Sequence, residues 1–152
     1  MIAWLSRKPG WAFSIYVLLD IICVGMGMGV PIFCILFGFV VGWVGTGIAT
    51  ARWGDAETVL GRLFRAAWLT SGITFIGMVL LWGPVTLMLL DPASDFVKFG
   101  IPLILYGPKA SFIGWLVLMI FISPFLQLLT TLLGGHVRLL FWLKAGKAAS
   151  GG

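Results

Sequence analysis

Charged residues divide this chain into long apolar blocks. Residues 9–51 contain a single charge, Asp20, whereas residues 66–90 and 110–137 contain no Asp, Glu, Lys or Arg. A helix that crosses ~30 Å of hydrocarbon needs about 20 predominantly apolar residues. The second and third blocks therefore each predict one membrane-spanning helix, over about 66–90 and 111–133.

The first block is too long for one crossing. As a single helix, residues 9–51 would extend ~65 Å at ~1.5 Å per residue, about twice the bilayer thickness. Residues 25–31 read Gly-Met-Gly-Met-Gly-Val-Pro. Glycine is a poor helix former, and the residue before a proline is pushed out of the α region. The sequence therefore predicts two helices, about 11–26 and 31–50, joined by a tight turn.

The basic residues test this division independently, because Lys and Arg collect in cytoplasmic loops. In a four-helix arrangement, one side of the membrane receives both termini and the second loop. That side holds eight of the ten basic residues: Arg7, Lys8, Arg52, Arg62, Arg65, Arg138, Lys144 and Lys147. Only Lys98 and Lys109 remain on the other side. We therefore expect four crossings with cytoplasmic N- and C-termini, in a prokaryotic plasma membrane.

Two further segments complete the predicted all-α, polytopic four-helix bundle. The outer loop, residues 91–111, contains an apolar stretch at 97–106 that is too short to span the bilayer. It is expected to lie in the interface or to re-enter the membrane. Residues 145–152 are small and polar and predict a disordered tail. Residues 1–144 then form a single transmembrane domain.

Composition supports a lipid environment and excludes a soluble domain. Hydrophobic residues make up 61% of the chain and charged residues 10%. Soluble domains have ~45–50% and ~25%, respectively. The net charge of +5 comes from basic residues scattered between apolar blocks, not gathered as a nucleic-acid-binding face. The expected partner is the lipid bilayer, with a second copy or a larger membrane complex, and no nucleic acid.

Asp20 is the sharpest candidate for chemistry. A charge within a membrane span costs roughly 2.5 kcal/mol or more, and no Lys or Arg lies in any predicted span. Its partners must therefore be hydroxyls, amides, backbone groups or water. Polar side chains on the third and fourth helices can supply them, giving a candidate intramembrane site of Asp20, Ser71, Thr74, Ser123 and Gln127. Two interpretations stay open: a proton or cation site, and a hydrogen-bonded strut between helices.

Small residues at helical spacing predict close helix packing. Gly38 and Gly42 share one face of the second helix, Gly77 lies on the third, and Gly134 lies on the fourth. Small-xxx-small patterns allow helices to approach closely in lipid. These faces have two possible interpretations. They serve helix packing alone, or they line a polar path beside Asp20.

Other reactive residues are few. Cys23 and Cys34 flank the predicted turn, and either a disulfide bridge or two thiols is consistent with their positions. His136 is the only histidine and is expected at the cytoplasmic interface. No metal-ligand spacing or nucleotide motif occurs, so we predict no cofactor and no enzymatic activity.

These features predict a non-enzymatic helical subunit that packs with itself or with a larger membrane complex. The alternative is a small oligomeric transporter or channel that uses Asp20 as a proton- or cation-coupling group. The two differ in what they expect of Asp20→Asn: a transporter loses coupled flux while it stays folded, whereas a structural strut keeps its function or loses stability.

Overall fold

The structure is a computed structural model that describes the backbone of residues 9–26, 32–98 and 105–150, and the side chains of residues 14–22, 32–98 and 105–146. In these ranges it is predominantly helical and contains no strand, which confirms the all-α class. The elements are α2 (Pro9–Met26), α3 (Ile32–Trp53), α4 (Ala56–Thr86), the 3₁₀ turn η1 (Leu87–Leu90), α5 (Pro108–Val117), the π-helical turn η2 (Leu118–Ile122) and α6 (Ser123–Ser150).

Three continuous helical segments are long and apolar enough to cross a membrane: Ile32–Trp53, Ala56–Leu90 and Pro108–Gly146. The tight turn predicted between the first two helices falls on residues 27–31, outside the described residues. Most of the apolar stretch predicted to lie in the interface, residues 99–104, is outside them as well.

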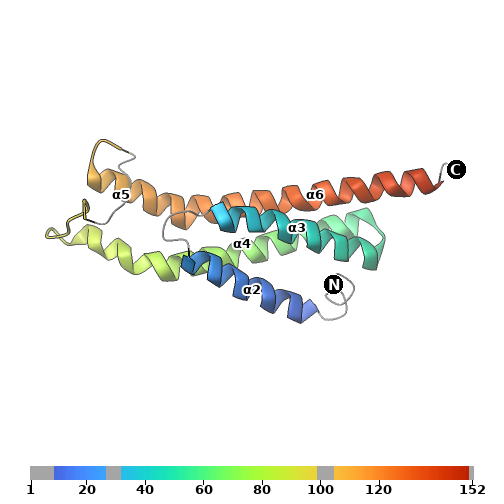
Figure 1. Cartoon of the computed structure of the whole chain (residues 1–152), viewed down its shortest axis with the longest axis horizontal. Coiled ribbons are helices and arrows are strands. Elements are labelled where there is room, and N and C mark those ends of the chain that lie inside the picture. Colours follow the sequence, from blue (N-terminus) through green and yellow to red (C-terminus); the bar gives the residue numbers. More distant parts are fainter. Residues whose placement is uncertain (1–8, 27–31, 99–104, 151–152) are drawn as a thin grey trace.

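The long helices α2, α3, α4 and α6 alternate in direction, and α5 continues through η2 into α6 (Figure 1). Tyr16 bonds to Thr70 and Asp20 bonds to Thr74, so α2 and α4 run the same way. The bond from Ser71 to Pro124 joins helices that run in opposite directions. The start of α2, the α3–α4 turn and the C-terminal part of α6 therefore lie toward one end of the bundle, which we call the basic end because it holds Arg52, Arg62, Arg65 and Arg138.

The closest helix pair is α3 with α6, and glycine makes this approach possible. A Cβ added to Gly38 would lie 2.7 Å from the Gln127 carbonyl oxygen, and one added to Gly42 would overlap the Thr131 backbone. A Cβ on Gly134 would likewise overlap the Phe39 carbonyl. Backbone packing of this kind replaces the hydrophobic driving force that helices lack in lipid.

Gly77 differs from the other three glycines that were predicted to pack closely against a helix. Apart from its chain neighbours and the backbone of its own helix, no described heavy atom lies within 4 Å of where its Cβ would be, so no described side chain packs against it. The spacing of small residues cannot distinguish these cases, because glycine occurs both where a helix packs closely and where no described neighbour approaches. Gly135, in contrast, is a packing glycine that the pattern analysis did not single out: its added Cβ would overlap the Leu63 side chain and would lie 2.8 Å from Thr46 Oγ1.

The turn before α4 is built by two residues. Gly54 takes a φ of 63°, a left-handed conformation that glycine tolerates without steric cost. Asp55 is the N-cap, and its carboxylate accepts a 2.9 Å hydrogen bond from the Thr58 amide. This backbone hydrogen bond lowers the pKa of Asp55 below its usual value. Helix α4 thus begins at Ala56 and not near residue 66, because capping, unlike hydropathy, sets where hydrogen bonding starts.

The last helix differs from its predicted bounds at both ends. Helical structure begins at Pro108 and continues to Ser150, so the proposed disordered tail is helical over residues 145–150. A π-helical turn, η2, lies directly before Ser123 and Pro124. Proline lacks an N–H and its ring crowds the carbonyl four residues earlier, which favours a local change of helical register there.

Candidate functional site

Asp20 lies inside the bundle, where three helices meet. Its side chain is 2% exposed, and those of Thr74 and Gln127 are fully buried. The Thr74 hydroxyl donates to Asp20 Oδ2 at 2.8 Å, and Gln127 Nε2 approaches Asp20 Oδ1 at 3.5 Å. The structure therefore brings together three of the five predicted polar residues, one each from α2, α4 and α6.

Tyr16 and Thr70 extend this cluster, and neither is among the five residues of the predicted site. The Tyr16 hydroxyl donates to the Thr70 carbonyl at 3.0 Å and accepts a 3.2 Å hydrogen bond from Gln127 Nε2. Each lies four residues before a cluster member, Tyr16 before Asp20 and Thr70 before Thr74, which places it on the same helix face. That i, i+4 spacing is the signal that could have found them. We call Tyr16, Asp20, Thr70, Thr74 and Gln127 the polar cluster.

Ser71 and Ser123 are buried nearby but do not bond to Asp20. The Ser71 hydroxyl donates to the Pro124 carbonyl at 2.7 Å and so ties α4 to α6. The Ser123 hydroxyl has no hydrogen-bond partner within the described part of the chain, and neither does Gln127 Oε1. Both atoms belong to α6, and each leaves hydrogen-bonding groups unused by the described side chains.

The carboxyl group of Asp20 is held by neutral donors. In residues 14–22, 32–98 and 105–146, the one salt bridge joins Lys98 to Asp95 on the surface. A hydroxyl and an amide satisfy the carboxylate oxygens but leave the negative charge uncompensated. In a medium of low dielectric constant, such a charge is costly until it gains a proton or a cation. This arrangement can therefore bind either one.

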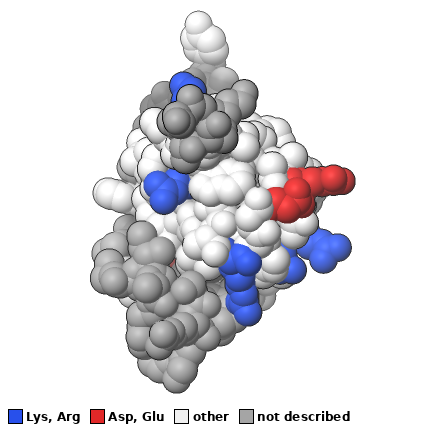
Figure 2. Space-filling model, turned by 90° about the vertical axis from the view of Figure 1, so that its right-hand side faces the viewer, with Lys and Arg blue, Asp and Glu red and all other residues white. Residues whose placement is uncertain are grey.

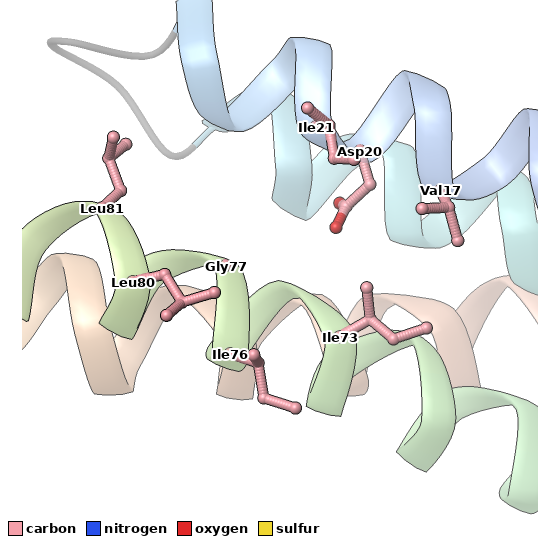
Figure 3. A pocket seen from close by; sticks show the side chains of 8 residues that line it. All are labelled: Val17, Asp20, Ile21, Ile73, Ile76, Gly77, Leu80 and Leu81. Atoms are coloured by element: carbon pink, nitrogen blue, oxygen red, sulfur yellow. The ribbon is translucent and has the colours of Figure 1, made fainter.

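A groove of about 480 Å³ reaches Asp20 from the side of the bundle. Figure 3 shows the Asp20 carboxyl group pointing from α2 toward α4, with Gly77 beside the space between them. The other lining residues are apolar: Val17, Ile21, Ile73, Ile76, Leu80 and Leu81. The open space at Gly77 is thus part of the groove.

The remaining candidates lie outside this site. His136 is exposed, and its Nδ1 lies 2.8 Å from the Leu132 carbonyl of its own helix. Cys34 is buried in the apolar core with Met78 and Trp82, and the side chain of Cys23 is not among those described. In the part of the chain that the structure describes, no group of three or more His, Cys, Asp or Glu residues could hold a metal ion.

Comparisons with protein-family models, curated proteins and solved structures found no match to this chain. Its class therefore rests on the fold itself: an all-helical chain with three segments suited to cross a membrane and a buried carboxyl group among neutral polar side chains.

Proposed function

We propose that this chain is an integral membrane protein that crosses the bilayer four times, with both termini in the cytoplasm. Besides the three long apolar helices, α2 has 18 residues and so extends ~27 Å, close to the hydrocarbon thickness. Figure 2 shows basic side chains at several places on the basic end, with acidic side chains at one edge, and an excess of basic residues is expected of a cytoplasmic side.

Within this topology, we propose that Asp20 is the proton- or cation-binding group of a small, oligomeric transporter or channel. The observation that carries the proposal is that a buried carboxyl group, bonded only by neutral donors, lines a laterally open groove. A strut between helices needs the hydrogen bonds but not the groove. Ionisable groups at membrane depth commonly mark ion or proton pathways.

The test is proton and cation flux in proteoliposomes containing purified protein. We expect Asp20→Asn to reduce flux by about tenfold or more, since the amide keeps the side-chain shape but cannot be ionised, and one unit charge is worth more than ~1.4 kcal/mol at such a site. Asp95→Asn is the matched control, because Asp95 is a surface residue paired with Lys98. Equal flux from wild type and Asp20→Asn, with both folded, would exclude the proposal.

A second candidate is a non-enzymatic subunit that packs with itself or with a larger complex. It is favoured by the large apolar side chains on the outer faces of α2 and α4, where Leu18 is 59%, Ile21 61% and Leu80 72% exposed. Lipid or another protein can cover these faces.

This candidate predicts a defined stoichiometry in mild detergent. Light scattering after size-exclusion chromatography is expected to give a fixed oligomer, or a complex with a second polypeptide at constant ratio. A single monodisperse monomer, retained on reconstitution into nanodiscs, would argue against a subunit.

A further inference from the structure

The α2–α4 groove has the properties of a small-molecule site. Its volume of about 480 Å³ lies within the ~300–1,000 Å³ typical of ligand pockets, which are mostly apolar with a few placed polar groups. Here the polar group is Asp20, and the other lining residues are apolar or glycine. A transmembrane helix, ~10 Å in diameter, is too large for this volume.

Among the described residues, the mouth of the groove is lined by side chains that face the surroundings of the bundle. Ile21, Ile76 and Leu80 line it and are 61%, 59% and 72% exposed. In a bilayer these side chains contact lipid, so a ligand would enter from the hydrocarbon region. Such a ligand must carry a substantial apolar body.

Charge complementarity defines the other half of the ligand. Asp20 receives hydrogen bonds from Thr74 and Gln127 but no positive charge from any described side chain. A cation at the inner wall of the groove would compensate the carboxylate where water cannot, and a neutral molecule would not.

We infer that the groove between α2 and α4 binds a small amphiphilic organic cation whose protonated amine pairs with the Asp20 carboxylate and whose apolar body lies against Ile73, Ile76 and Leu80. This inference rests on the proposed cation-binding role of Asp20 and names the class of ligand. Gly77 lines the groove, and among the described side chains none lies within 4 Å of the position that its added Cβ would take.

The experiment measures saturable binding of tritiated phenylbutylamine to the full chain in lipid nanodiscs, with phenylbutanol as the neutral competitor. We expect the unlabelled amine to displace the tracer at concentrations about tenfold lower than the alcohol. The alcohol carries no charge, so it cannot form the buried ion pair with the Asp20 carboxylate. Asp20→Asn is expected to weaken binding by a similar factor. Equal competition by amine and alcohol would mean that the groove accepts any lipid-like chain, and the inference would fall.

Gly77→Leu separates the groove from the carboxyl group. It fills the space without replacing Asp20, and we expect it to abolish saturable amine binding while thermal stability remains. Gly72→Leu is the matched control on α4, because no heavy atom lies within 4 Å of its added Cβ either, and it should bind like the wild type. If Gly77→Leu fails to fold, Gly77→Val serves instead.

The outcomes distinguish this inference from the proposed function. Asp20-dependent proton flux without saturable amine binding would overturn the amine site and leave the transporter proposal standing. Amine binding that survives in a folded Gly77→Leu would place the ligand elsewhere and would also overturn the inference.

Discussion

Gly42→Ala is expected to destabilise the bundle by roughly 3 kcal/mol or more, since overpacking costs ~1–3 kcal/mol where side chains can give way. Here the added methyl group would overlap the backbone carbonyl of Thr131, and a peptide group inside α6 cannot rotate aside. Relief would require α3 and α6 to separate, which would disturb every contact along this pair. Equilibrium unfolding in mixed detergent micelles, followed by circular dichroism, measures the loss.

Gly45→Ala is the control for this prediction. Gly45 lies three residues further along α3, and no heavy atom lies within 4 Å of its added Cβ. Helix propensity alone makes Ala more favourable than Gly by ~1 kcal/mol, so the two variants should change stability in opposite directions. Similar effects in both would mean that α3 and α6 do not approach as closely as described.

Thr74→Val is the second substitution with a large expected effect. Valine keeps the shape of threonine but removes the hydroxyl that donates to Asp20 at 2.8 Å. Leaving a buried polar group unpaired costs ~1–3 kcal/mol, and more when the group is charged. We therefore expect a loss of ~2–3 kcal/mol, measured in the same unfolding assay.

A double-mutant cycle shows whether this loss comes from Asp20. In Asp20→Leu/Thr74→Val both partners are apolar, so the second substitution should cost much less than it does alone. Thr86→Val is the matched control, because the Thr86 hydroxyl donates within its own helix to the Gly83 carbonyl at 2.6 Å. Additive single and double effects would show that Thr74 acts independently of the carboxyl group.

The polar cluster was predictable only in part. Asp20, Thr74 and Gln127 stand out because polar groups are rare within apolar segments, and any such group needs a partner. Tyr16 did not stand out, since a tyrosine is compatible with either lipid or protein surroundings. Ser71 was correctly expected to be polar and buried, but its partner is the Pro124 carbonyl, and a backbone acceptor leaves no trace in a residue pattern.

The ends of the helices show a similar division. Uncharged blocks indicate which residues avoid water, and they locate the apolar segments well. They do not indicate where hydrogen bonding begins or ends, so α4 starts at Ala56 behind its Asp55 cap and α6 extends to Ser150. Helix bounds depend on caps and local propensity, which continue across charged residues.

By itself, the amino-acid sequence determined the helical class, the apolar segments and the isolation of one carboxyl group, because these follow from the solvent preference of side chains. Only the tertiary structure decided that α3 packs most closely on α6, that Gly77 borders open space, and that Asp20 faces a groove. Packing depends on which helix surfaces come into contact. The shapes of residues that lie far apart in the sequence decide which surfaces fit together. Two glycines in similar sequence patterns can therefore differ: Gly42 packs against the backbone of α6, whereas Gly77 lines the groove.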